Sequence, residues 1–140
     1  MGAWEKEIGA ITLFVEDLEK SKAFYQDIFE LEPMFVEDDG TGFRLKNLYF
    51  FLTKSSAAPN MIAPAVAGAP GNGPRHVFAI IVPDVDGVCA ELETKGIKLI
   101  NGPEDRDWGM RTANFADPDG YVWEIAQEMS EAAGSEAAGS

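Results

Sequence analysis

The chain contains one structural pattern twice, and this internal repeat constrains its fold more than any other feature. Residues 14–19 read Phe-Val-Glu-Asp-Leu-Glu, and residues 81–86 read Ile-Val-Pro-Asp-Val-Asp. Each copy follows an apolar, strand-like run and leads into a stretch with apolar residues three and four apart, as in an amphipathic helix. The repeat predicts an α+β fold in which two tandem βαβββ modules form a curved mixed sheet around a cleft.

The turn and helix signals place module one at about 8–53 and module two at about 76–128. Both modules are expected to lie in a single domain over residues 1–129, followed by a flexible tail or linker over 130–140 that is rich in small and polar residues. The intervening segment 54–75 is rich in Ala, Pro and Gly and has no periodicity. We expect it to be a connector with some lid character, because irregular loops of this length in compact domains are unusual.

Within module one, the alternation of residues 10–15 predicts a strand, and Asp17 is suited to cap the helix that follows. Further strands are expected at 33–37, 42–46 and 48–53.

Module two repeats this order, with strands expected at 76–82, 98–100, 110–115 and 122–127 and a helix over about 85–95. The segment Asp117-Pro-Asp-Gly120 predicts a tight turn, since Pro presets one turn dihedral angle and Gly permits a positive φ.

Charge and cysteine content narrow the classes of partner and compartment. The net charge of −13 argues against binding to nucleic acid or to an anionic membrane, because both would repel such a surface. No apolar run reaches the ~20 residues of a membrane helix, and the first residues do not resemble a signal peptide. The single cysteine, Cys89, cannot form an internal disulfide and fits a reducing compartment, so a cytoplasmic location is expected. Cys89 is expected to pack in the core.

Several motifs together resemble the vicinal oxygen chelate superfamily, which includes glyoxalase I, extradiol dioxygenases and bleomycin-resistance proteins. The matching segments are Val15-Glu-Asp17-Leu18, Phe24-Tyr25, Val82-Pro-Asp84-Val85 and Asp117-Pro-Asp-Gly-Tyr-Val-Trp-Glu124. The pair Trp108-Gly109, which leads into a strand that ends at Asp-Pro-x-Gly, is closest in pattern to the bleomycin-resistance branch. That branch implies metal-free drug binding by an acidic homodimer.

The resemblance also implies where a metal would be bound. Metal-binding members have one ligand on the first strand and one on the last strand of each module, which correspond here to Ala10, Phe51, Val77 and Glu124. A catalytic divalent metal needs at least three protein ligands, and only Glu124 offers an oxygen atom. We therefore expect neither a metal nor another cofactor. His76 is offset by one residue from the ligand position and should point to the helix side, unless a bulge reorients it to form half a site with Glu124.

Alternation from Glu124 predicts an aromatic, mostly apolar ligand site. Its expected members are Thr12, Phe14, Tyr49, Phe51, Trp108, Arg111, Asn114 and Glu124. Trp108 would stack on a flat ligand. Arg111 would pair with a ligand acid or with Glu124, although the register that brings Asn114 to this face turns Arg111 to the other side, where a structural ion pair is the alternative.

These residues predict a metal-independent small-molecule binding protein of the glyoxalase/bleomycin-resistance type. It would act as a homodimer and sequester a small aromatic or cationic metabolite or antibiotic in an aromatic cleft. One alternative is a metal-dependent glyoxalase-like lyase, isomerase or dioxygenase, and a narrower one is a metal-free enzyme with Glu124 as general base. A regulatory module with a vestigial cleft is a further alternative.

Overall fold

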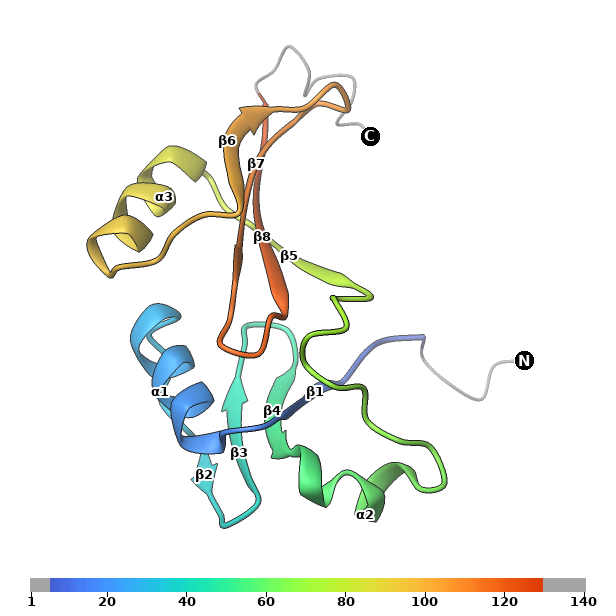
Figure 1. Ribbon diagram of the computed structural model, residues 1–140. Coiled ribbons are helices and arrows are strands. Elements are labelled where there is room, and N and C mark those ends of the chain that lie inside the picture. Colours follow the sequence, from blue (N-terminus) through green and yellow to red (C-terminus); the bar gives the residue numbers. More distant parts are fainter. Residues whose placement is uncertain (1–5, 130–140) are drawn as a thin grey trace. The chain divides into compact units, whose positions relative to one another are not determined.

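The computed structural model describes residues 6–129, which divide between Asn72 and Gly73 into two compact units (Figure 1). Unit 1 ends at Asn72 and unit 2 begins at Gly73, inside the expected connector. The grouping of both into one domain over residues 1–129 stays a prediction, and the expected tail over 130–140 lies outside the described residues.

Unit 1 is a βαβββ module with a four-stranded sheet in the order β1-β4-β3-β2. Its elements are β1 (Ala10–Val15), α1 (Leu18–Ile28), β2 (Phe35–Val36), β3 (Gly40–Arg44) and β4 (Tyr49–Lys54), followed by η1 (Ser55–Ala57) and α2 (Pro59–Ile62). Strand β1 pairs with β4 in parallel, and the other pairs are antiparallel.

Helix α1 begins at a cap and is held to the sheet by aromatic packing. The carboxylate of Asp17 accepts a hydrogen bond from the backbone N–H of Lys20 at 3.1 Å, as the sequence predicts. Tyr25 and Phe50 are fully buried, and their ring centroids lie 4.9 Å apart in an edge-to-face arrangement. Truncating such a ring to Ala costs about 3–5 kcal/mol, so this cluster fixes α1 on one face of the sheet.

Unit 2 repeats the same topology, with a sheet in the order β5-β8-β7-β6. Its elements are β5 (Val77–Ile81), α3 (Val85–Thr94), β6 (Asn101–Asp105), β7 (Met110–Ala116) and β8 (Val122–Glu128). The side chain of Asp84 caps α3, as Asp17 caps α1. The internal sequence repeat therefore reflects two copies of one strand–cap–helix arrangement, and the expected α+β class with βαβββ modules is confirmed.

The Asp117-Pro-Asp-Gly120 segment forms the expected turn between β7 and β8. Asp117 is buried, and its Oδ1 accepts hydrogen bonds from the backbone N–H groups of Asp119 and Tyr121, each at 2.9 Å. Gly120 has a φ of +92°, which a residue with a β-carbon rarely adopts. This turn fixes the register in which β7 and β8 face each other.

One expectation about local structure is wrong. Residues 98–100 do not form a strand: Lys98 and Leu99 line a pocket beside α3, and β6 begins at Asn101. Strand β6 instead contains Pro103 and a bulge between Asn101 and Glu104, and it lies at the edge of the sheet, where Pro is tolerated. The connector 54–75 includes η1 and α2, and its expected lid character stays a prediction.

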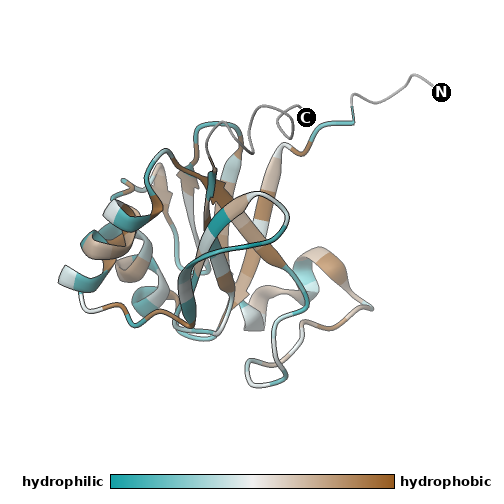
Figure 2. Ribbon diagram, turned by 90° about the horizontal axis from the view of Figure 1, so that it is seen from above, coloured by the Kyte–Doolittle hydropathy of each residue, from teal (hydrophilic) through white to brown (hydrophobic). Residues whose placement is uncertain are grey.

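The most hydrophobic residues lie mainly on the strands (Figure 2). Within residues 6–129, no helix has both the length and the apolar character needed to cross a membrane.

Candidate functional site

Side-chain alternation divides the sheet of unit 1 into a face under α1 and an opposite face, which we call the aromatic face. Leu13, Phe50 and Leu52 are buried on the α1 side. In β1 and β4, the residues that alternate with these three point to the aromatic face. The register pairs Thr12 with Phe51, Ala10 with Tyr49 and Phe14 with Thr53, so four predicted site residues share the aromatic face. These four are Thr12, Phe14, Tyr49 and Phe51.

Three rings form a row across the aromatic face. The rings of Tyr49 and Phe51 are parallel within 2°, with centroids 6.2 Å apart. The ring of Phe35, on the neighbouring β2, lies 6.0 Å from that of Phe51. Phe51 is half-buried, whereas Phe35 and Tyr49 are 38% and 40% exposed, so the row presents aromatic surface to solvent.

Gly42 makes room for the outer ring of this row. It pairs with both Phe35 and Phe51, and a β-carbon built at this position would meet the ring edge of Phe35. The glycine therefore has a packing role, because Phe35 lies across the sheet where a side chain would otherwise stand.

Arg44 lies at the other end of the row, opposite Tyr49 in the β3–β4 register. Its guanidinium carbon is 4.8 Å from the centroid of the Tyr49 ring, and its Nε donates a hydrogen bond to the carbonyl oxygen of Leu45 at 3.3 Å. Such a cation–π contact holds the guanidinium group over the ring. Within residues 6–129, Arg44 has no carboxylate partner.

The sheet of unit 2 has a corresponding face opposite α3, which we call the polar face. Asn114 lies opposite Glu124 and Thr112 opposite Ala126 in the β7–β8 register. Glu124 is half-buried and forms neither a hydrogen bond nor an ion pair with any residue that the structure describes. Asn114 donates a hydrogen bond through Nδ2 to Asn101 at 3.0 Å, which leaves its Oδ1 as an acceptor. Glu124 and Asn114 can therefore accept hydrogen bonds from N–H or O–H groups.

Arg106 completes the polar face, although sequence reasoning did not single it out. Its Nε donates to Thr112 Oγ1 at 2.8 Å and its Nη2 to Asn101 Oδ1 at 3.2 Å, while Nη1 lies 3.1 Å from a Glu104 carboxylate oxygen. These bonds fix Asn101 beside Asn114. Arg106 thus supports the acceptor Asn114 through Asn101, and each of its own three nitrogen atoms has a partner.

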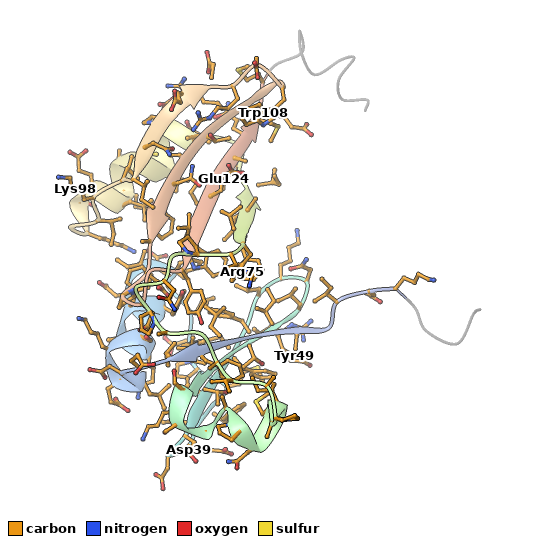
Figure 3. All side chains as sticks on the ribbon, turned by 45° about the vertical axis from the view of Figure 1, so that its right-hand side comes forward. Asp39, Tyr49, Arg75, Lys98, Trp108 and Glu124 are labelled. Atoms are coloured by element: carbon orange, nitrogen blue, oxygen red, sulfur yellow. The ribbon has the colours of Figure 1, made fainter. Side chains whose placement is uncertain are left out.

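Trp108 lies in the turn between β6 and β7 and is 64% exposed (Figure 3). Its ring centroid is 5.8 Å from the guanidinium carbon of Arg106. This exposure fits a stacking role, which stays a prediction.

Arg111 lies on the α3 side rather than on the polar face, and its expected role as a ligand contact stays a prediction. The β7–β8 register pairs it with Gln127, on the α3 side. Its Nε and Nη2 donate to the two carboxylate oxygens of Asp86 at 3.1 and 3.0 Å, and its Nη1 donates to Asp105 at 2.8 Å. The bidentate bond holds the pKa of Asp86 below its ordinary value, and both carboxylates raise the pKa of Arg111. Arg111 thus forms the structural ion pair considered as the alternative.

The residues at the family's metal-ligand positions do not fit a metal ion. Ala10 and Phe51 in unit 1 and Val77 in unit 2 offer no ligand atom in their side chains, so Glu124 is the one carboxylate of the set. Among residues 6–129 there is no group of three or more His, Cys, Asp or Glu side chains that could hold a metal.

His76 does not change this conclusion. The centroid of its ring lies 4.4 Å from that of the Phe78 ring and 5.7 Å from that of the Tyr121 ring. Phe78 in turn packs on the buried Trp123, so His76 is turned to the helix side, as its one-residue offset predicts.

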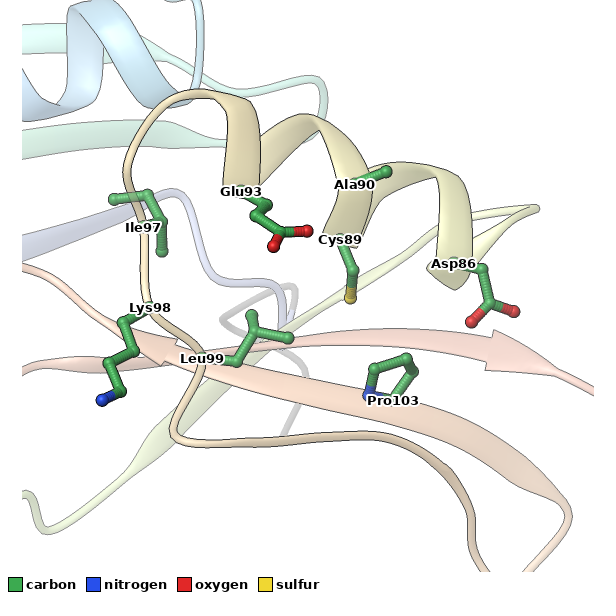
Figure 4. Close-up of a pocket in the computed structure, with 8 residues that line it drawn as sticks. All are labelled: Asp86, Cys89, Ala90, Glu93, Ile97, Lys98, Leu99 and Pro103. Carbon is green, nitrogen blue, oxygen red and sulfur yellow. The ribbon is translucent and has the colours of Figure 1, made fainter.

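A pocket of about 430 Å³ lies on the α3 side of unit 2 (Figure 4). One wall is a stripe of α3 that includes Asp86, Cys89 and Glu93, and the other is formed by residues between Ile97 and Pro103. Cys89 is 8% exposed, as expected for a core residue, and burial is the main cause that raises the pKa of its thiol. The pocket contains none of the predicted ligand-binding residues.

Sequence reasoning missed Phe35 and Arg44 as well as Arg106. Glycines at positions 40 and 42, two apart in a strand, were the available signal for a bulky side chain from the neighbouring strand. The signal for Arg44 was the register of the β3–β4 hairpin. In this hairpin Leu45 donates a backbone hydrogen bond to Leu48, and Arg44 is therefore the cross-strand partner of Tyr49.

Two βαβββ modules, each with a helix on one face of its sheet, define this chain as a protein of the vicinal oxygen chelate class. The chain belongs to the Glyoxalase/Bleomycin resistance protein/Dioxygenase superfamily, whose model matches residues 7–125. It is 29% identical over 119 residues to the uncharacterized protein YraH of Bacillus subtilis (strain 168), covering 82% of this chain and 93% of YraH.

Solved structures share the fold. A glyoxalase/bleomycin resistance protein/dioxygenase from Nocardioides has a TM-score of 0.81 and 22% identity, with 91% of this chain and 87% of that chain covered. A glyoxalase-related enzyme from Fulvimarina pelagi has a TM-score of 0.75 and 24% identity, with 89% of each chain covered. Lactoylglutathione lyase from Agrobacterium tumefaciens has a TM-score of 0.72 and 22% identity, with 88% of this chain and 94% of that chain covered.

Proposed function

We propose that this protein is a metal-independent binding protein that sequesters a small aromatic molecule, a metabolite or an antibiotic, on the aromatic face of unit 1. The observation that carries the proposal is the row of Phe35, Phe51 and Tyr49, three neighbouring rings with solvent-exposed surface on one face of the sheet. Aromatic side chains in a soluble domain are usually buried, and a contiguous exposed group of them is typical of an interaction site.

The polar face of unit 2, taken by itself, suits a ligand with hydrogen-bond donors. Glu124 and the Oδ1 of Asn114 are both acceptors, and neither has a donor among the residues that the structure describes. A hydroxyl or N–H group on a metabolite or antibiotic would satisfy them, and the charge of the ligand is left open. Trp108 would contribute stacking, as it does in the prediction from sequence.

The metal-independent form of the proposal rests on the donor set. Alanine, phenylalanine and valine at three of the four family positions cannot coordinate a divalent ion, and a lone carboxylate binds one weakly. A lyase or dioxygenase that chelates its substrate through a metal would need a different set of residues.

We also propose that the protein is a cytoplasmic homodimer. The single Cys89 fits a reducing compartment. Strand β5 lies at an edge of its sheet and carries the exposed apolar side chains Val77 and Ile81, 49% and 65% exposed, which suit pairing with a second copy. Light scattering should give twice the chain mass of 15.2 kDa, and the monomer mass would contradict the proposal.

A titration with a neutral aromatic probe tests the binding function. We expect 2-naphthalenemethanol to bind saturably in calorimetry, and Phe51→Leu to weaken its affinity about tenfold, because one ring contact in the row is lost. Phe24→Leu is the matched control, since it makes the same change on α1, under the opposite face of the sheet. Absence of binding by the wild type, or equal effects of the two substitutions, would contradict the proposal.

A further inference from the structure

The proposed function leaves the charge of the aromatic ligand open, and Arg44 bears on it. The structure describes four arginines: Arg106 and Arg111 have carboxylate partners, whereas Arg44 and Arg75 have none. Arg75 is exposed and makes no hydrogen bond or ring contact with the described residues. Arg44, in contrast, is held in place by the Tyr49 ring and by the carbonyl oxygen of Leu45.

The geometry points to a ligand that is an aromatic carboxylate, whose ring lies on the Phe35–Phe51–Tyr49 row and whose acid group pairs with Arg44. This inference rests on the proposed function and adds the chemical class of its ligand.

The first step in the argument concerns the donors that Arg44 retains. A guanidinium group has five N–H donors in a fixed planar fork. The Nε donor is engaged with Leu45, and among residues 6–129 neither Nη1 nor Nη2 has an acceptor. Two such terminal groups can bind both oxygens of one carboxylate.

The second step concerns position. Arg44 and Tyr49 are cross-strand partners, with the guanidinium carbon 4.8 Å from the Tyr49 centroid, and the Phe51 centroid is 6.2 Å further along the strand. The positive charge thus lies at the end of the ring row. A ligand whose ring contacts Tyr49 or Phe51 can bring an acid group close to the ring into contact with Arg44.

The third step concerns local charge. The chain has a net charge of −13, which would repel an acid at long range. Residues 40–54, which form β3, β4 and their turn, contain no Asp or Glu and include two lysines as well as Arg44. The acidic turn 37–39 precedes β3, at the end of that strand opposite to Arg44. Charges beyond about 8 Å are largely screened at physiological ionic strength. Arg44, the positive charge over the Tyr49 ring, therefore decides whether the ring row prefers an acidic, a neutral or a basic ligand. For the same reason an ammonium group would be disfavoured at this end, because a cation already lies over the Tyr49 ring.

Three naphthalene probes that differ in one group test the inference: 2-naphthoate, 2-naphthalenemethanol and 2-naphthylmethylammonium. In calorimetric titrations of the full chain we expect the acid to bind roughly tenfold more tightly than the alcohol, and the amine more weakly than the alcohol. The measured quantity is the ratio of the affinity for the acid to the affinity for the alcohol. A substitution that weakens ring stacking lowers both affinities equally and leaves this ratio unchanged.

Two variants assign the preference to a residue. Arg44→Gln should reduce the acid-to-alcohol ratio to near one, whereas Arg75→Gln removes the same charge and should leave the ratio at its wild-type value. An amine that binds as tightly as the acid, or a ratio unchanged in Arg44→Gln, would overturn the inference. Those results would leave the proposed function standing as long as the alcohol binds; failure of every probe would instead refute the proposed function.

Discussion

The ring of Phe35 lies against Gly42, its cross-strand partner, at the point where a β-carbon would stand. This contact lets Phe35 extend the ring row begun by Tyr49 and Phe51. A glycine within a strand thus contributes to the proposed binding face rather than to a turn.

Gly42→Ala tests whether that contact organises the row. The new methyl group would displace the ring of Phe35, which is exposed and can move, so we expect the free energy of unfolding to change by less than about 1 kcal/mol. Affinity for 2-naphthalenemethanol should fall about fivefold, because one aromatic contact is lost. Calorimetry and urea denaturation measure the two effects.

Gly9→Ala is the control for this substitution, since a β-carbon there would have no atom within 4 Å. A Gly42→Ala variant with unchanged affinity would show that Phe35 is not part of the site.

Much of the fold could be predicted from the sequence because its signals are local. Asp17 and Asp84 cap helices by bonding to backbone N–H groups three residues ahead, and Asp117 and Gly120 form a turn within five residues. The repeat of the Asp-capped pattern therefore predicted both modules.

The predicted site was less complete because its contacts depend on register between strands. The register expected around the turn at 117–120 placed Asn114 on the face of Glu124, and the two residues are cross-strand partners. Arg106, however, reaches that face through a hairpin that contains a bulge, and the position of such a bulge has no clear local signal. Arg111, the arginine that the sequence pattern favoured, lies one residue from Thr112 and so points to α3.

Trp108→Ala tests the predicted stacking role on unit 2. The side chain is largely exposed, so its removal should change the free energy of unfolding by no more than about 0.5 kcal/mol. In a Trp4→Phe background, any ligand-induced change in tryptophan fluorescence should disappear, because the remaining Trp123 is buried and shielded from a ligand. Fluorescence titration of both proteins provides the measurement, and a retained signal together with unchanged affinity would exclude Trp108 from the site.

The Asp86–Arg111 bond predicts a pH dependence of stability. Because the bond lowers the pKa of Asp86 in the folded state, it stabilises the fold above the unfolded pKa of about 4. The stabilisation is lost as pH falls through the lower, folded pKa. Urea denaturation of the wild type and Asp86→Asn should therefore show a difference that is largest near neutral pH and shrinks below pH 4. A difference that stays constant down to low pH would mean that the charge of Asp86 does not contribute.

Cys89 should be unreactive in the native protein. It is buried, and both burial and the neighbouring charge of Asp86 raise the pKa of its thiol, so little thiolate exists at pH 7. We expect a thiol-specific chromogenic disulfide to label it slowly in buffer and completely in urea. Rapid stoichiometric labelling of the native protein would show that the thiol is accessible from the pocket beside α3.

The most direct test of metal-independent aromatic binding is a calorimetric titration of chelator-stripped protein with 2-naphthalenemethanol, with metal content checked by elemental mass spectrometry. We predict saturable binding with the same affinity before and after stripping, and no gain on addition of a divalent metal. Binding that disappears with the metal and returns when Zn²⁺, Ni²⁺ or Mn²⁺ is added would contradict it.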